Sequence, residues 1–410
     1  MNLFDEFDEP VEFSDNSDTD TDEECTANDD SQKFGMKSEC VFNKLRAFHS
    51  VTSMPPDCLH DLFEGVLAQD LLGIIRILKI KGWFSYEDYN LALKRFPLSP
   101  QEASNKPQPV PLKNSVKKLS GKAVSVWCHA RFFLSILSSN DWMNDPEDIT
   151  VRLAIVLTDI THRVTAERFE VYEIYRLEEI ILEYLDLRKL VFEEYPILGS
   201  AKPKHHYLTH YGSNISQFGP AMGFWTGRYE SKHRVAKAVA ESSKNFRNIS
   251  LTISNRQQLR MASTYYHGMF PEEEFSLPVL VKKRADLSDS DFDGSLRAFV
   301  GEEDLLCNEI TWRERTYKVG TVVVITRKDL LEIRVGVIKS VLMKNGEVYL
   351  LVRRAILIQN SSKVFETDKV EDNLVFVNIK SLQDTYPLFK RGSDEKYFVI
   401  PHHHISFIYE

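Results

Sequence analysis

Cysteine is scarce in this chain, and long apolar runs are absent. Five cysteines occur in 410 residues, widely spaced and without a Cys-x-x-Cys pair, which excludes a disulfide framework and a zinc finger. The most apolar stretch, residues 70–80, is broken by Arg76 and Lys79, and the N-terminus is acidic rather than basic and then apolar. We therefore expect a soluble protein of a reducing compartment, the nucleus or the cytoplasm, with no membrane contact. The cysteines are Cys25, Cys40, Cys58, Cys128 and Cys307.

The acidic residues of the chain are concentrated at its N-terminus. Residues 1–34 hold thirteen Asp and Glu against Lys33 alone, and subtracting this −12 from the net charge of −9 leaves +3 for residues 35–410. The segment has too few apolar side chains to offset the entropy cost of ordering, which predicts a disordered, solvated arm. The alternative is an interaction tail, or a decoy for a basic surface elsewhere in the chain.

Acidic residues are nearly missing between residues 201 and 260. Ten Lys and Arg stand there against Glu230 and Glu241, interleaved with His and aromatic residues. Such a segment suits contact with a polyanion such as DNA, and it also suits an ordinary basic surface. The candidate nucleic-acid-binding residues are Lys202, Lys204, His205, His210, Arg228, Lys232, His233, Arg234, Lys237, Lys244 and Arg247, followed by Arg256 and Arg260.

The apolar pattern predicts an α+β protein, with a mainly helical region over residues 35–270. A helix with one buried face starts at Asp57 and stops at Gly82, and Ser85 with Asp88 resembles a capping box before the next helix. Residues 271–302 are acidic, show no apolar period and are expected to be a linker. Further helices are expected over residues 122–138, 148–161, 166–194, 206–218, 226–240 and 255–266, with a proline-rich loop over residues 97–111.

Residues 303–410 are predicted to form a small antiparallel β-barrel or sandwich. Runs of β-branched residues alternate with turn residues, and the Asn-Gly pair at 345–346 is a strong hairpin signal. Trp312, Tyr317 and Tyr349 suit a peptide-binding cage of the Tudor type, which would make this part a module for a protein partner. Core burial is favoured, because aromatic side chains usually serve it.

Four polar residues at the start of the first helix have the spacing of a metal site. Asp57, His60, Asp61 and Glu64 fall at i, i+3, i+4 and i+7, so they are expected to share one face. Carboxylates bind hard divalent cations, and imidazole favours zinc or manganese. A solvated helix start is the favoured interpretation on spacing alone, because acidic side chains stabilise the positive end of a helix. The His triplet at 402–404 lacks a second ligand cluster and indicates a strand end.

Glu230 is a lone carboxylate in the helix predicted from Thr226. It is a candidate metal ligand for phosphoryl transfer, with the neighbouring cations holding a phosphate backbone. The alternative is a first-turn Glu that pairs with Arg234 at i+4, a contact that stabilises a helix by a few tenths of a kcal/mol. Spacing alone favours this surface pair.

Four blocks of residues carry a resemblance to a known family. They are PPDCLHDLFEGV at residues 55–66, KHxxxxHY at 204–211, GP at 219–220 and WxxRYExKH at 225–233. In this order they resemble the C-terminal half of CACTA (En/Spm-type) DDE transposases, and most of all the animal members. The resemblance spans about residues 35–270.

The resemblance implies an RNase H-like fold in which two Asp and one Glu bind two divalent ions, Mg²⁺ or Mn²⁺, for DNA strand cleavage and transfer. A helical insertion separates the second Asp from the Glu in this family. Asp57 and His60 match the family's D-x-x-H motif at the head of the insertion, and Glu230 matches the catalytic Glu. Gly227 stands where plant members carry a Glu, so the match at Glu230 follows the animal pattern.

The two catalytic Asp of the family lie upstream of the D-x-x-H motif on core strands. Here 56 residues precede Asp57, and Asp15 and Asp18 lie in no strand pattern. Two-metal chemistry needs carboxylates on both sides of the metal pair. The resemblance therefore implies a truncated or domesticated transposase that is catalytically inactive, with Glu230 as a relic, and that still binds DNA through residues 200–260.

Two other functions remain open from the sequence. One is a residual metal-dependent nuclease or transposase that takes the missing carboxylates from a second copy or a full-length transposase. The other is a non-enzymatic protein-interaction scaffold. Strongly salt-dependent DNA binding without cleavage favours the DNA-binding remnant, and failure to bind DNA at low salt favours the scaffold.

Overall fold

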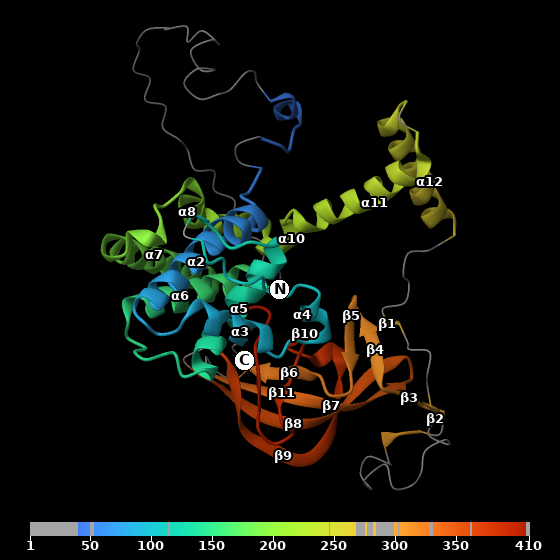
Figure 1. Cartoon of the computed structure of the whole chain (residues 1–410). Coiled ribbons are helices and arrows are strands. Elements are labelled where there is room, and N and C mark those ends of the chain that lie inside the picture. The colour runs from blue at the N-terminus through green and yellow to red at the C-terminus, as the bar shows by residue number, and fades with distance from the viewer. Residues whose placement is uncertain are drawn as a thin grey trace, which may run out of the picture. The chain divides into compact units, whose positions relative to one another are not determined.

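A computed structural model divides the chain into two compact units, Met1–Pro55 and Pro56–Glu410. The helix described in the first unit is η1 (Val41–Lys44), a short 3₁₀ turn. The predicted disordered arm over residues 1–34 lies outside the described part of the chain. The structure (Figure 1) describes residues 40–49, 53–113, 115–245, 247–267, 275–276, 282–283, 299–301, 303–327, 331–360 and 363–406.

The second unit begins with helices and ends with strands, as the sequence predicts. Its first helix is a π-helix, η2 (Leu59–Leu67), which continues directly into α2 (Ala68–Ile80). The other helices are α3 (Tyr86–Arg95), α4 (Pro100–Ala103), α5 (Ala123–Ser139), α6 (Ile149–Val164), α7 (Val171–Glu194), η3 (Pro196–Leu198), α8 (Pro203–Tyr207), η4 (Leu208–His210), α9 (Tyr211–Phe218), α10 (Ala221–Phe224), α11 (Gly227–Ser243) and α12 (Ile249–Tyr266).

Side-chain caps set several of these helix boundaries. The Ser85 hydroxyl accepts the Asp88 N–H at 3.1 Å, which confirms the predicted start of α3. The Asp148 carboxylate accepts the Thr150 N–H at 2.8 Å at the start of α6. Gly82 follows α2 with φ +79°, the left-handed conformation in which glycine commonly ends a helix.

Several helix predictions differ from the structure, and α12 starts at Ile249 rather than near residue 255. The loop over residues 97–111 contains α4, because Ser99 and Glu102 form a reciprocal capping box. The helix expected over 166–194 starts only at Val171, where Glu170 and Glu173 cap it. The helix expected over 206–218 is split into α8, η4 and α9.

The helices share one apolar core. The buried faces of η2 and α2 pack with α5, α6 and α7, and the ring of Phe63 stacks on Trp127 with 5.6 Å between centroids. Tyr89 and His129 are both buried and share a hydrogen bond of 2.8 Å. Each large apolar side chain buried in this way contributes roughly 1.5–3 kcal/mol.

The C-terminal part is an antiparallel sheet that curls (Figure 1). Its central neighbour order is β10-β6-β7-β8-β9-β12-β11, with β3 beside β7 and β2 beside β3, while β1, β4 and β5 form a separate three-stranded sheet. The strands are β1 (Phe275–Ser276), β2 (Lys282–Lys283), β3 (Leu305–Cys307), β4 (Glu309–Trp312), β5 (Arg315–Lys318), β6 (Val322–Arg327), β7 (Glu332–Lys344), β8 (Glu347–Gln359), β9 (Phe365–Asn378), β10 (Asp384–Leu388), β11 (Arg391–Gly392) and β12 (Tyr397–Val399), with the 3₁₀ turn η7 (Ile379–Ser381) before β10.

Two expectations for the C-terminal part are confirmed. Asn345 and Gly346 join β7 to β8 with φ of +52° and +79°, the backbone that an Asn-Gly hairpin turn requires. Trp312 and Tyr317 are buried in the sheet core, which confirms burial for these two, whereas Tyr349 is partly buried. Two short strands lie within the predicted linker, where β1 pairs with β4 and β2 pairs with β3. None of the helices in the described part is long and apolar enough to span a membrane.

A buried charge cluster joins the curled sheet to the helices. The Glu102 carboxylate pairs with Arg391 at 2.7 Å and with Arg131 at 3.2 Å, and all three side chains are buried. Arg131 also donates to the carbonyl of Pro401 at 3.1 Å. Burial lowers the pKa of Arg391 to about 10, and Glu102 opposes this shift. The cluster fixes the sheet against α4 and α5.

Candidate nucleic-acid interface and the Asp57–His60–Glu230 cluster

Asp57 is the anchor of the candidate site. One of its carboxylate oxygens accepts the backbone N–H of Thr226 at 3.0 Å, and the other accepts the Thr226 hydroxyl at 2.5 Å. Burial by itself raises the pKa of Asp57, but these bonds and a bond with His60 outweigh it, so the pKa lies below its usual value. The contact holds the start of η2 against the start of α11. No local sequence pattern predicts this contact, because Asp57 and Thr226 are 169 positions apart.

His60 lies between two carboxylates. Its Nδ1 is 2.5 Å from Asp57 Oδ2, and its Nε2 is 3.2 Å from Glu230 Oε1. The structure thus brings together the three residues that the resemblance singles out. It also gives Glu230 a partner other than Arg234, the partner that spacing alone favours.

The expected shared face of Asp57, His60, Asp61 and Glu64 is wrong. His60 is exposed, whereas Asp61 is only 8% exposed. The segment is the π-helix η2, so the α-helical spacing on which the expectation rests does not apply to it. Burial raises the pKa of Asp61, and Lys204 opposes this shift.

Gly65 makes room for Lys204 beside this cluster. The Lys204 ammonium donates to the backbone carbonyl of His60 at 2.6 Å. A Cβ at position 65 would lie 2.6 Å from the Lys204 Cδ and 3.0 Å from the His60 carbonyl oxygen. Lys204 is therefore a positioning residue for η2 as well as a candidate phosphate contact.

His205 is not a surface residue, although the sequence predicts it as a nucleic-acid contact. It is buried, and its Nε2 lies 3.4 Å from the carboxylate of Asp70. Asp70 also accepts Arg188 Nε at 2.7 Å and the hydroxyl of Tyr184. Burial raises the pKa of Asp70, but His205 and Arg188 outweigh it and keep the pKa low. The sequence signal that was missed is a carboxylate inside an apolar run, which needs a buried partner.

The remaining basic candidates lie where solvent reaches them. Lys202 and His210 are exposed near α8 and η4, and the other cations follow α11, α12 and the turn between them. Nothing is described for the side chain of Arg228. The exposed members of the helix pair are Lys232, His233, Arg234, Lys237, Lys244, Arg247, Arg256 and Arg260.

Two hydrogen bonds tie α11 and α12 together as a hairpin. Asn245 donates to the Thr252 hydroxyl at 3.1 Å, and Arg256 donates to the Ser242 hydroxyl at 3.3 Å. Residues 227–266 contain eight Lys and Arg against two Glu, a net charge of +6. None of the described side chains of α12 is buried. We call these two helices and their turn the basic hairpin (Figure 1).

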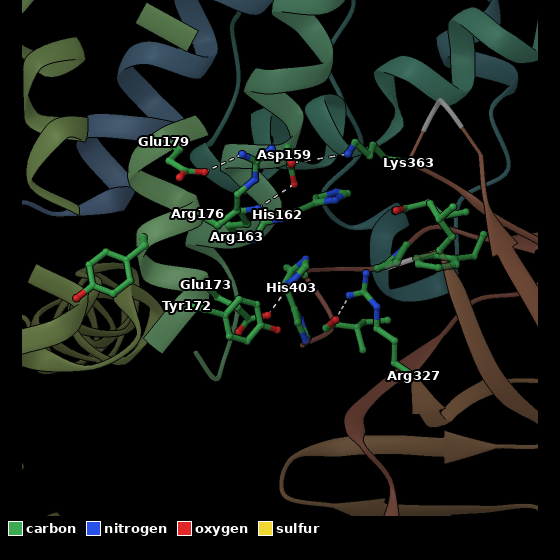
Figure 2. Close-up of a pocket in the computed structure, with 17 residues that line it drawn as sticks. Asp159, His162, Arg163, Tyr172, Glu173, Arg176, Glu179, Arg327, Lys363 and His403 are labelled. Atoms are coloured by element: carbon green, nitrogen blue, oxygen red, sulfur yellow. Dashed lines mark hydrogen bonds and ion pairs between the residues drawn. The ribbon is translucent and has the colours of Figure 1, made fainter. Parts of the chain in front are cut away.

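A separate cavity of about 580 Å³ lies between α6, α7 and the sheet (Figure 2). Its charged walls pair with each other: Asp159 lies 3.2 Å from Arg163 and 3.7 Å from Lys363, and Arg176 lies 2.8 Å from Glu179. Because opposite charges compensate around this cavity, it does not offer the one-signed field that a polyanion needs.

His403 and His404 border this cavity, and the triplet at 402–404 lies just past the end of β12 rather than within it. It follows β12 and contacts both the helices and the sheet. His403 lies 3.0 Å from Asp384, and His404 lies 2.9 Å from Glu173. Burial lowers the pKa of His403, but Asp384 outweighs burial and the pKa is raised. Burial lowers the pKa of His404 to about 4, and Glu173 opposes this shift. His403 therefore pairs with Asp384 within the C-terminal part, and His404 links that part to Glu173 of α7 through a hydrogen bond.

Within the described residues, no group of three or more His, Cys, Asp and Glu side chains is arranged to hold a metal ion. Glu230 Oε1 and both ring nitrogens of His60 are engaged with each other and with Asp57. Comparison of the chain with models of protein families, with curated proteins and with solved structures found no match.

Proposed function

We propose that this protein is a transposase-derived DNA-binding protein that uses the basic hairpin as its binding element. The observation that carries the proposal is a net charge of +6 on two helices, one of which has no buried side chain among those described. Cations that face water rather than carboxylates are available to phosphates. Displacing the counterions of DNA then supplies the binding free energy.

The geometry around Asp57 supports the transposase ancestry. His60, which matches the D-x-x-H motif, contacts Glu230, which matches the catalytic Glu, at 3.2 Å across 170 positions of sequence. In this proposal the helices from η2 to α10 correspond to the family's helical insertion. The helix α11 then corresponds to the element of the RNase H-like core that carries the catalytic Glu.

The same geometry supports binding rather than strand cleavage. Two-metal catalysis needs several carboxylates around an ion pair. Here Glu230 is engaged by His60, and Asp57 is engaged by Thr226 and His60. The cluster therefore acts as a brace that holds the base of the basic hairpin on η2.

The test is fluorescence anisotropy with a labelled DNA duplex of 20 base pairs over a range of salt concentrations. The full chain is compared with the triple variant Lys232→Gln, Arg234→Gln, Lys237→Gln and with a matched triple, Lys94→Gln, Arg95→Gln, Lys189→Gln, whose cations are exposed on α3 and α7. The hairpin variant should lose at least tenfold in DNA affinity. The slope of log K, the logarithm of the binding constant, against the logarithm of the salt concentration should become smaller in magnitude by about 2–3. The matched triple should bind within twofold of the parent chain.

Other outcomes favour other functions. DNA cleavage that depends on Mg²⁺ or Mn²⁺ and is lost in Glu230→Gln would establish a residual nuclease in place of a binding remnant. Failure of the full chain to bind DNA at low salt would overturn the proposal and favour a protein-interaction scaffold.

A further inference from the structure

The basic hairpin carries a groove as well as a charge. The groove lies between α11 and α12 and encloses about 340 Å³. Its walls contain two cations and no carboxylate, together with aromatic and apolar surface. The lining residues are Lys232, Val235, Gln257, Arg260, Met261, Thr264 and Tyr265.

The groove residues follow helical periodicity on both helices. On α12, Gln257, Arg260, Met261, Thr264 and Tyr265 stand at i, i+3, i+4, i+7 and i+8, which places them on one face. Arg256 of α12 lies outside this set of residues, and it donates a hydrogen bond to the Ser242 hydroxyl that ties the two helices together. The groove is therefore a strip on the surface of the helix pair and not a cavity inside an apolar core.

Exposed tyrosine rings lie on both helices of the hairpin. Tyr229 is 60% exposed, and the Lys232 ammonium lies 5.8 Å from the centre of its ring. Tyr265 is 67% exposed and Tyr266 is 87% exposed. Rings that face water over this much of their surface are open to stacking by a base.

The chemistry of the strip distinguishes between nucleic-acid forms. A duplex hides the faces of its bases inside the stack and presents phosphates, so it engages only the cations. A single strand offers base faces that stack on aromatic side chains, at about 1–3 kcal/mol per base, together with phosphates for the cations. Only the single strand uses both the tyrosines and the cations.

We propose that the groove of the basic hairpin binds single-stranded DNA, with bases stacked on Tyr229 and Tyr265 and the backbone held by Lys232 and Arg260. This inference rests on the proposed DNA binding and specifies its substrate. The like charge of two such hairpins disfavours a second copy of this chain as the occupant, whereas a polyanion complements the charge.

The experiment compares a labelled dT oligonucleotide of 20 nucleotides with a duplex of 20 base pairs and with oligo(U) of the same length, at one salt concentration. The full chain should bind the dT strand at least tenfold more tightly than the duplex. The double variant Tyr229→Ala, Tyr265→Ala should lose at least tenfold for the dT strand and less than twofold for the duplex. The double variant Tyr229→Phe, Tyr265→Phe keeps both rings and should bind as the parent chain does.

Tyr175→Ala is the matched control, because Tyr175 is an exposed tyrosine on α7, outside the basic hairpin. Circular dichroism of each variant separates loss of stacking from loss of helix. Equal affinity for duplex and single strand, or equal losses for both in the alanine variant, would overturn the groove proposal and leave duplex binding intact. Tighter binding of oligo(U) than of dT would overturn the choice of DNA. No binding of any probe would overturn the proposed function itself.

Discussion

The helical core and the basic hairpin treat charged side chains in opposite ways. In the core, Asp70 and Arg188 are buried and form an ion pair of 2.7 Å, and Glu102 holds two buried arginines. In the basic hairpin, Lys232, Arg234 and their neighbours remain in water, with few carboxylates near them. The same residue types therefore have a structural role in one region and are available to a partner in the other.

The difference follows from the cost of desolvation. A buried charge without a partner costs several kcal/mol, so the core needs every charge to be matched. An exposed charge pays no such cost and contributes little to folding. Charge in the basic hairpin can therefore be selected for binding without loss of stability.

Removing the buried carboxylate of Asp70 should have the largest effect on folding. Asp70→Asn leaves Arg188 buried without its counter-charge, and we expect a loss of about 3–5 kcal/mol in the free energy of unfolding, measured with urea. Asp186→Asn, at an exposed position of the same helix as Arg188, should change it by less than about 0.5 kcal/mol. A loss below about 1 kcal/mol in Asp70→Asn would contradict the structural role of the pair.

Acid should weaken the contact between the helices and the sheet. Burial lowers the pKa of His162 to about 3, with Arg131 lowering it further and Asp159 opposing, and the charges of Lys363 and His404 also face it. Because the folded pKa lies below the unfolded value of 6.5, the unfolded state takes up protons first as the pH falls. Stability is therefore full above pH 6.5 and is lost below it, by about 2 kcal/mol between pH 6.5 and 5.

Urea unfolding of the parent chain and of His162→Gln over this pH range checks the prediction. The variant should show a shallower pH dependence, whatever its stability at pH 7. His403 contributes with the opposite sign, because Asp384 raises its pKa and its stabilisation is lost as the pH rises. Identical slopes in both chains would show that His162 is not the acid-sensitive group.

Loss of the Thr226 hydroxyl should have a moderate effect confined to the Asp57 brace. Thr226→Val removes a hydrogen bond to a carboxylate and should cost about 1–2 kcal/mol. The pKa of Asp57, followed by carboxyl NMR, should rise, so its contribution to stability is lost at a higher pH as acid is added. Thr226→Ser keeps the hydroxyl and should resemble the parent chain in both measurements.

Neutralising Glu230 should have the smallest effect on stability. Its side chain is half exposed, so Glu230→Gln should change the free energy of unfolding by less than about 0.5 kcal/mol. DNA affinity should rise about twofold, because one anion leaves a basic surface. A large loss of stability would show that Glu230 has a structural role like that of the buried charges of the core. The basic hairpin would then not differ from the core in how it uses charged side chains.

Local sequence chemistry predicted much of the fold. Ser85 and Asp148 marked helix starts because their side chains accept nearby backbone N–H groups. Asn345 and Gly346 marked a hairpin because both adopt positive φ. These signals depend on neighbours within four residues, so they can be recognised without knowledge of the fold. Spacing failed at η2, because helical periodicity assumes an α-helix and this segment is a π-helix.

The candidate site could be predicted only in part, because its contacts join residues that are far apart in the sequence. The basic composition of residues 201–260 was visible without a structure, but His205 carries the same residue type as His210 and is buried, while His210 is exposed. No pattern in the chain separates these two histidines. The partner of His205 is Asp70, 135 positions away, and only packing brings them together.

By itself, the sequence determined an α+β chain with an acidic N-terminal segment and a basic segment near its middle, because composition and periodicity are local properties. Tertiary structure alone decided which charges face water. It placed Asp70, Glu102 and Asp384 against buried cations and left the described cations of the basic hairpin exposed to water. It also brought His60 to Glu230, and it formed a tyrosine-lined groove from two helices. The physical reason is that burial and partner choice depend on distances in space, which a chain acquires only when it folds.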